Sequence, residues 1–215
     1  MPTNFPNDKK NPDQIPWVLD PKDLTDEDVL AAMKQISGYL DITPGDFKEV
    51  YAVAYSQAHK RILSTPARKF MTSPVHYVWK DQSVLEVARL LARVHVAGVP
   101  VLEKGDENVV GVISEKDFMR RLAGEEQSFM GLVAACMGSK GCPALKIKGQ
   151  TAAEIMSSPA VTVSPDTPVH AMYALMREKA INRLPVLEGT RLMGIVSRDD
   201  LLGALAFVSG KEKTK

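Results

Sequence analysis

The chain has 215 residues, of which 45% are hydrophobic and 25% charged, so its composition is that of a folded protein rather than a disordered one. Its 27 Lys and Arg residues nearly balance its 26 Asp and Glu residues, which excludes the chain-wide positive field of many nucleic-acid-binding proteins. No run approaches the roughly 18 to 20 consecutive apolar residues of a membrane span, and the polar, proline-rich start is not typical of a signal peptide. We therefore expect a cytoplasmic protein without a nucleic-acid or membrane partner.

The first segment, residues 1–66, is expected to be an arm followed by a helical hairpin. Thr25, three residues before Asp28, predicts a capping box at the start of one helix, and Thr43 followed by Pro44 predicts the start of a second. Two helices cannot bury both of their apolar stripes alone, so we expect the hairpin to dock on the rest of the protein or on a second copy. The stripe of the first helix is Val29, Met33, Ile36 and Leu40.

An internal repeat follows, and it determines the expected architecture. The motif "MTSP" at 71–74 matches "MSSP" at 156–159, an offset of 85 residues, and "GVPVLE" matches "RLPVLE" at the same offset. After a variable turn the offset becomes 83 residues, and "GVISEKD" at 111–117 matches "GIVSRDD" at 194–200.

Each copy predicts the same order of elements. A short strand after the proline, at Val75 to Val78 or Ala160 to Val163, precedes a helix, two further strands and a last helix that begins after the serine. A unit of about 50 residues buries too little apolar surface alone, so the two copies are expected to pack face to face.

Residues 124–150, between the copies, are long for a connector inside one compact module. Their motif "SFMGLVAACM" predicts an accessory apolar helix capped by Ser128, and residues 209–215 are expected to be a flexible tail. The two cysteines, Cys136 and Cys142, are too few for a disulfide framework and have no further Cys or His at zinc-ligand spacing, so we expect reduced thiols and no bound metal. The alternatives are a redox pair or a shared metal site.

The repeated phrase places Ser114 before Asp117, and Ser197 before Asp200, at the start of a helix. Backbone N–H groups at such a start can bind a phosphate, and an aspartate one turn along can accept hydrogen bonds from two ribose hydroxyls. The preceding glycine allows a ligand or a neighbouring backbone to approach closely. The same spacing is also a capping box that stabilises the helix by about 1 kcal/mol, so these residues alone leave nucleotide binding and capping open.

Taken together, these motifs resemble a tandem of cystathionine-β-synthase (CBS) domains, the pair called a Bateman module. The resemblance covers residues 67–123 and 151–208. It implies an α/β (α+β) fold of two pseudo-symmetric β-α-β-β-α repeats, commonly paired with a second chain as a homodimer. It also implies a small-molecule ligand in the clefts between the repeats, an adenine nucleotide (AMP, ADP or ATP) or alternatively S-adenosylmethionine.

The resemblance and the local charges define the expected binding site. The second repeat is expected to hold anions better, because Asn182, Arg183 and Arg198 stand where the first repeat has Ala97, Gly98 and Glu115. The expected ribose contacts are Asp117 and Asp200. The expected phosphate contacts are Ser114, Lys116, Arg183, Ser197 and Arg198. The expected base pocket is Val75, Tyr77, Val99, Ala160, Thr162 and Leu184, with Gly98, Pro100, Asn182 and Pro185 beside it.

The sequence contains no Walker-type glycine loop, no GxGxxG motif and no nucleophile elbow, so an enzyme is not predicted. The predicted function is a non-enzymatic sensor that binds an adenine ligand between its repeats. One alternative is a dimerising scaffold with empty clefts, in which the Ser-x-x-Asp pairs are only helix caps. Another is a regulatory subunit that binds an unidentified enzyme or transporter through its N-terminal helices.

Overall fold

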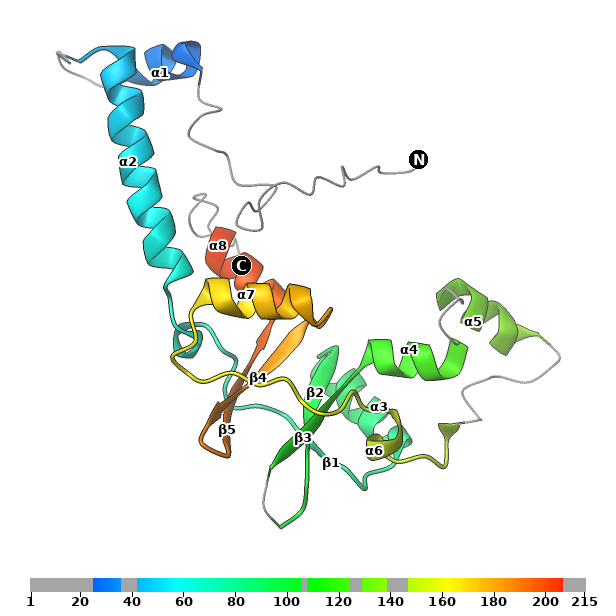
Figure 1. Ribbon diagram of the computed structural model, residues 1–215. Coiled ribbons are helices and arrows are strands. Elements are labelled where there is room, and N and C mark those ends of the chain that lie inside the picture. The colour runs from blue at the N-terminus through cyan, green and yellow to red at the C-terminus, as the bar shows by residue number, and fades with distance from the viewer. Residues whose placement is uncertain (1–24, 36–41, 106–107, 124–128, 139–146, 207–215) are drawn as a thin grey trace.

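The computed structural model describes residues 25–35, 42–105, 108–123, 129–138 and 147–206. It confirms the expected fold class, a mixed α+β protein built from two similar repeats (Figure 1). The elements in chain order are α1 (Asp26–Met33), α2 (Pro44–Leu63), η2 (Ala67–Lys69), β1 (Val78–Trp79), α3 (Val84–Val94), β2 (Gly98–Leu102), β3 (Val109–Ser114), α4 (Glu115–Ala123), α5 (Phe129–Met137), α6 (Ala152–Ile155), α7 (Val169–Glu178), β4 (Arg183–Glu188), β5 (Arg191–Ser197) and α8 (Arg198–Ala206).

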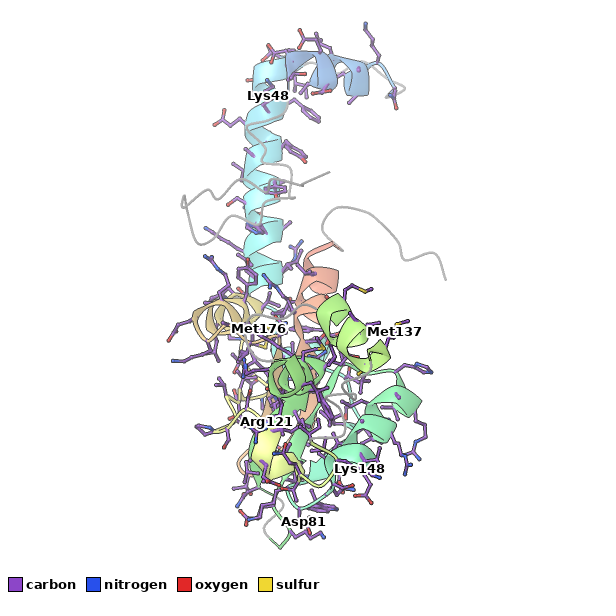
Figure 2. The ribbon with its side chains drawn as sticks, turned by 90° about the vertical axis from the view of Figure 1, so that its right-hand side faces the viewer. Lys48, Asp81, Arg121, Met137, Lys148 and Met176 are labelled. Atoms are coloured by element: carbon purple, nitrogen blue, oxygen red, sulfur yellow. The ribbon has the colours of Figure 1, made fainter. Side chains whose placement is uncertain are left out.

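Helix α1 begins at the predicted capping box of Thr25 with Asp28, and α2 begins after the predicted cap residue Thr43, which also forms a capping box, with Asp46. Helix α2 extends away from the repeats and carries α1 at its far end, where Lys48 pairs with an aspartate of α1 (Figures 1 and 2). No residue of α2 is buried, and its last turn, at Ile62 and Leu63, packs against the apolar cluster of the second repeat. The hairpin therefore docks on the repeats at the end of α2, as far as the described residues show. Ile36 and Leu40 of the predicted stripe lie outside the described residues.

The hydrogen bonds that cap α2 lead to a prediction about the ionisation of Asp46. The hydroxyl and the backbone N–H of Thr43 donate to Asp46 and hold the pKa of that carboxyl below its ordinary value. Because the pKa of this carboxyl is lower in the folded state than in the unfolded state, its ionised form stabilises the helix at pH values above the unfolded-state pKa. This stabilisation is lost as the pH falls through the folded-state pKa. Thr43→Ala should therefore raise the pKa of Asp46 toward the ordinary value of an aspartate. An NMR titration checks this, with the carboxyl of Asp28 as the control that should not move.

Each repeat contains one antiparallel strand pair, β2 with β3 and β4 with β5. Strand β1 pairs in parallel with β2, and Val163 makes the corresponding bridge to β4 in the second repeat. The first strand of each repeat therefore begins later than predicted, at Val78 rather than Val75, and is only one bridge long in the second copy. Helices α3 and α7 begin after Ser83 and Pro168, as predicted.

The two repeats interlock, because the segment before each one packs on the other. Ala67 and Met71 join the apolar cluster of α7, β4, β5 and α8, and Thr72 bridges to Ile195 of β5. In the same way α6 joins the cluster of the first repeat, and Ser157 bridges to Val112 of β3. The expected packing of the repeats is thus reinforced by an exchange of chain segments.

The predicted insertion helix is α5, which lies beside α4 (Figure 1). Met137 stands on its outward side with 84% of its surface exposed (Figure 2). Cys136 is disulfide-bonded, so the expectation of reduced thiols was wrong. A disulfide needs two sulfur atoms in bonding geometry and an oxidant, and a count of cysteines tests neither. Cys142 and Ser128 lie outside the described residues.

Among the residues with described positions, no helix combines the length and apolar character needed to cross a membrane. The same residues hold no cluster of three or more His, Cys, Asp or Glu side chains that would bind a metal ion.

Candidate functional site

A cleft of about 490 Å³ lies where the two repeats meet. The first repeat contributes the end of β3 and the first turns of α4. The second repeat contributes residues 157–161, which follow α6, and residues 179–183, which connect α7 to β4. Both repeats are therefore needed to build this one site.

Asp117 is the buried acid of the cleft, with 5% of its surface exposed. Its Oδ2 accepts hydrogen bonds from the backbone N–H of Ser114 at 2.8 Å and from the Ser114 hydroxyl at 2.6 Å. Its Oδ1 accepts a 2.7 Å bond from the hydroxyl of Ser157 and lies 3.8 Å from a guanidinium nitrogen of Arg120. The aspartate thus caps α4 and links the two repeats.

Basic side chains dominate the rest of the lining. Among the described residues that line the cleft, four cations face two carboxylates, so this described lining is net positive. The carboxylates are Glu115 and Asp117, and Lys179 also pairs with Glu178 at 2.9 Å. A net positive, partly enclosed cleft suits a phosphate. The four cations are Lys116, Arg120, Lys179 and Arg183.

Arg183 is half-buried where the two Ser-x-x-Asp motifs come together. Burial lowers its pKa, and nearby carboxylates oppose that effect. Because guanidinium groups remain protonated at physiological pH, Arg183 keeps its charge in this environment. The acids near it are Glu115, Asp199, Asp117 and Asp200.

The structure places the predicted site residues in different groups from those that the sequence suggested. Arg183 was grouped with the second repeat's own serine and aspartate, but it lines a cleft with Ser114 and Asp117 of the first repeat. The reason is the interlocked packing, which places the α7–β4 turn against the start of α4. The predicted residues that line this cleft are Ser114, Lys116, Asp117, Ala160, Asn182 and Arg183.

Other predicted residues lie elsewhere. Val75 and Tyr77 line a separate pocket of about 440 Å³ beside the β4–β5 turn. Strand β2 is fully buried, which makes Gly98, Val99 and Pro100 core residues, as are Leu184 and Pro185 of β4. The lining of the 490 Å³ cleft does not include Thr162, Ser197, Arg198 or Asp200.

Sequence reasoning missed Arg120, Ser157 and Lys179 as parts of the cleft. Arg120 follows Asp117 by three residues on α4, a spacing that brings two side chains to one helix face and was a usable signal. Ser157 and Lys179 come from the other repeat, and no local spacing relates them to Asp117.

The repeat alignment provides an internal comparison for the four cations. Each of them is replaced at the equivalent position of the other copy, where Lys116 corresponds to Asp199 and Arg120 to Gly203. Likewise Lys179 corresponds to Val94 and Arg183 to Gly98. In the other direction, Arg198 corresponds to Glu115, and the histidines His76 and His95 correspond to Val161 and Ala180. The positive charge is therefore concentrated in one of two pseudo-symmetric positions.

The fold and the site define a pseudo-symmetric pair of α+β repeats with a cationic cleft at their junction. A family model for the CBS domain matches residues 67–124 and 152–207, more than half of the chain, so the chain belongs to the CBS domain family.

Known proteins agree with this assignment. The chain is 28% identical over 152 residues to MJ1426 of Methanocaldococcus jannaschii. The aligned region covers 64% of this chain and 89% of that protein. The CBS domain of a membrane protein from Sphaerobacter thermophilus matches with a TM-score of 0.57 and 27% identity, over 73% of this chain and 96% of that one.

Two solved structures with adenosine-containing ligands share the fold. CBSX2 in complex with AMP matches with a TM-score of 0.52 and 24% identity, over 67% of this chain and 98% of that one. The CBS domain pair of MJ0100, in complex with 5′-methylthioadenosine and S-adenosyl-L-methionine, matches with a TM-score of 0.50 and 21% identity. This match covers 66% of this chain and 97% of that one. CBS domain pairs of this fold therefore include binders of AMP and of S-adenosylmethionine.

Proposed function

We propose that this protein is a regulatory module that binds an adenine nucleotide in the cleft between its CBS repeats. The phosphate would lie among Lys116, Arg120, Lys179 and Arg183, and the ribose near Asp117. The apolar side chains of Pro159, Ala160 and Ile181, which line the same cleft, would contact the base.

The observation that carries this proposal is the unequal charge of the two pseudo-symmetric positions. If the Ser-x-x-Asp motifs served only as helix caps, nothing would require four cations around one of them and none at the equivalent positions of the other. A bound phosphate accounts for the difference, because each charge-assisted hydrogen bond to it is strong. The structures with AMP and with S-adenosylmethionine support the general ligand class.

The positive lining favours a nucleotide over S-adenosylmethionine. A phosphate is attracted by net positive charge, whereas the sulfonium of S-adenosylmethionine is repelled by it. Binding would order the cleft and shift the repeats relative to one another, and a homodimer of the module in the cytoplasm would transmit that shift to a partner. Regulation rather than catalysis is the expected role of the family.

Calorimetric titration with AMP, ADP, ATP and S-adenosylmethionine tests the proposal. Arg183→Ala should weaken nucleotide binding by about 10- to 100-fold, since a half-buried charge-assisted contact contributes about 1.5 to 3 kcal/mol. Arg198→Ala is the matched control, because Arg198 does not line this cleft, and should change affinity by less than about threefold.

Two outcomes would contradict the proposal. A larger loss in Arg198→Ala than in Arg183→Ala would place the nucleotide near Asp200 instead. If the folded protein gives no heat of binding with any of the four ligands, the dimerising scaffold is favoured. The repeated motif would then serve only as a helix cap.

A further inference from the structure

Ser157 contacts Asp117 at Oδ1, the carboxylate oxygen that Ser114 does not use. Its hydroxyl donates a 2.7 Å hydrogen bond to Oδ1 of Asp117, across the junction between the repeats. The backbone of Ser157 is held independently of this bond. Its N–H donates to the carbonyl of Val112 at 2.9 Å, and its carbonyl accepts from the N–H of Val112 at 3.0 Å. The hydroxyl can therefore rotate away without releasing the chain segment.

Asp117 has too few free acceptor positions for a ribose diol. A carboxylate offers about four lone-pair sites. Ser114 fills two of them on Oδ2, and Ser157 fills one on Oδ1, which leaves about one. The two hydroxyls of a ribose need two, and Asp117 is only 5% exposed. A ribose can reach this carboxylate with both hydroxyls only if one existing donor leaves.

Ser157 is the donor that can leave. The Ser114 bonds are part of the cap at the start of α4, and one of them comes from the backbone. The bond from Ser157 comes from a freely rotating hydroxyl.

The other repeat lacks this arrangement. Asp200 accepts the equivalent bonds from Ser197 at 2.8 and 2.7 Å, and it is half-buried rather than buried. Thr72 is the counterpart of Ser157 in the repeat alignment. Within the described part of the chain, its hydroxyl donates no bond to Asp200, whose Oδ1 accepts none.

We infer that Ser157 is a positioning residue that competes with the ligand's ribose for Asp117. In the empty cleft it satisfies the buried carboxylate, and in the occupied cleft the 2′- and 3′-hydroxyls of the ribose replace it. Ser157 thereby lowers the affinity for ribose-containing ligands and couples their binding to a contact between the repeats. This inference rests on the proposed nucleotide binding.

Calorimetric titration with AMP and with 2′,3′-dideoxy-AMP tests it. Ser157→Ala should bind AMP about three- to tenfold more tightly than the wild type, because the ligand no longer has to break a hydrogen bond to a charged group. The affinity for 2′,3′-dideoxy-AMP should not change, since that ligand has no hydroxyls to place on Asp117. Thr72→Ala is the matched control and should leave both affinities unchanged.

A second variant distinguishes the expected change in affinity from an effect of lost structure. Ser157→Cys keeps the side-chain volume and supplies only a weak donor, so it should also tighten AMP binding. Thermal melting of each variant shows that it is folded. Unchanged or weaker AMP binding in a folded variant would overturn the inference, as would an equal gain for the dideoxy ligand or for Thr72→Ala. If the wild type binds no nucleotide at all, the proposed function fails and the inference fails with it.

Discussion

Asp117→Ala is expected to lower the free energy of unfolding by about 3 kcal/mol. The substitution removes the acceptor of three hydrogen bonds, two from Ser114 and one from Ser157. Loss of a helix cap typically costs about 0.5 to 2 kcal/mol, and leaving donors unpaired in a buried site adds about 1 to 3 kcal/mol. Urea denaturation monitored by circular dichroism measures the change.

Asp200→Ala is the matched control for that experiment. Asp200 accepts the same bonds from Ser197, but it is half-buried, and among the described residues it has no counterpart to the Ser157 bond. We expect a loss of about 1 kcal/mol, the contribution of the cap alone. Equal losses in the two variants would show that the bond across the repeats contributes nothing to stability.

Gly111→Ala is expected to destabilise the protein by about 2 to 3 kcal/mol, because an added Cβ has no room. The Cβ would lie 2.5 Å from the sulfur of Met156 and 2.9 Å from the carbonyl oxygen of Ser157. The methionine can move, but the carbonyl belongs to the backbone that bridges to β3. The thermal midpoint and the urea midpoint should both fall.

Gly194 holds the equivalent position in the second repeat and provides the comparison. The three atoms nearest to a Cβ there are all side-chain atoms of Met71, the nearest being the sulfur at 2.5 Å. A flexible methionine can repack, so Gly194→Ala should cost about 1 kcal/mol. A larger loss at Gly194 than at Gly111 would mean that the methionine, rather than the backbone, is the rigid element.

These glycines also explain why the repeated phrase begins as it does. The sequence indicated that a glycine there allows close approach, and the structure identifies what approaches. The methionine of "MSSP" packs on the glycine of "GVISEKD", and the methionine of "MTSP" packs on the glycine of "GIVSRDD". The two halves of each motif pair lie in different repeats, so the spacing within one repeat cannot reveal the contact.

The N-terminal helices show the opposite case, in which local signals were sufficient for the secondary structure. Capping boxes at Thr25 and Thr43 depend only on residues three positions apart, and both helices begin where these boxes predict. How far the hairpin docks depends on distant surfaces. Among the described residues, the last turn of α2 packs against the apolar cluster of the second repeat.

The sequence by itself determined the repeat, the α+β class, the helix starts and the two Ser-x-x-Asp motifs, because each depends on periodicity or on residues a few positions apart. The tertiary structure decided which residues share a cleft. Each repeat donates its leading segment to the other, so Arg183 and Ser157 of the second repeat meet Asp117 of the first. The sequence alone ranked the charges repeat by repeat and favoured the second. Packing across the junction places Arg183 in the cleft of Asp117 instead and leaves Arg198 outside it. Electrostatic attraction depends on distance in space rather than along the chain, so a ranking by repeat could not find this cleft.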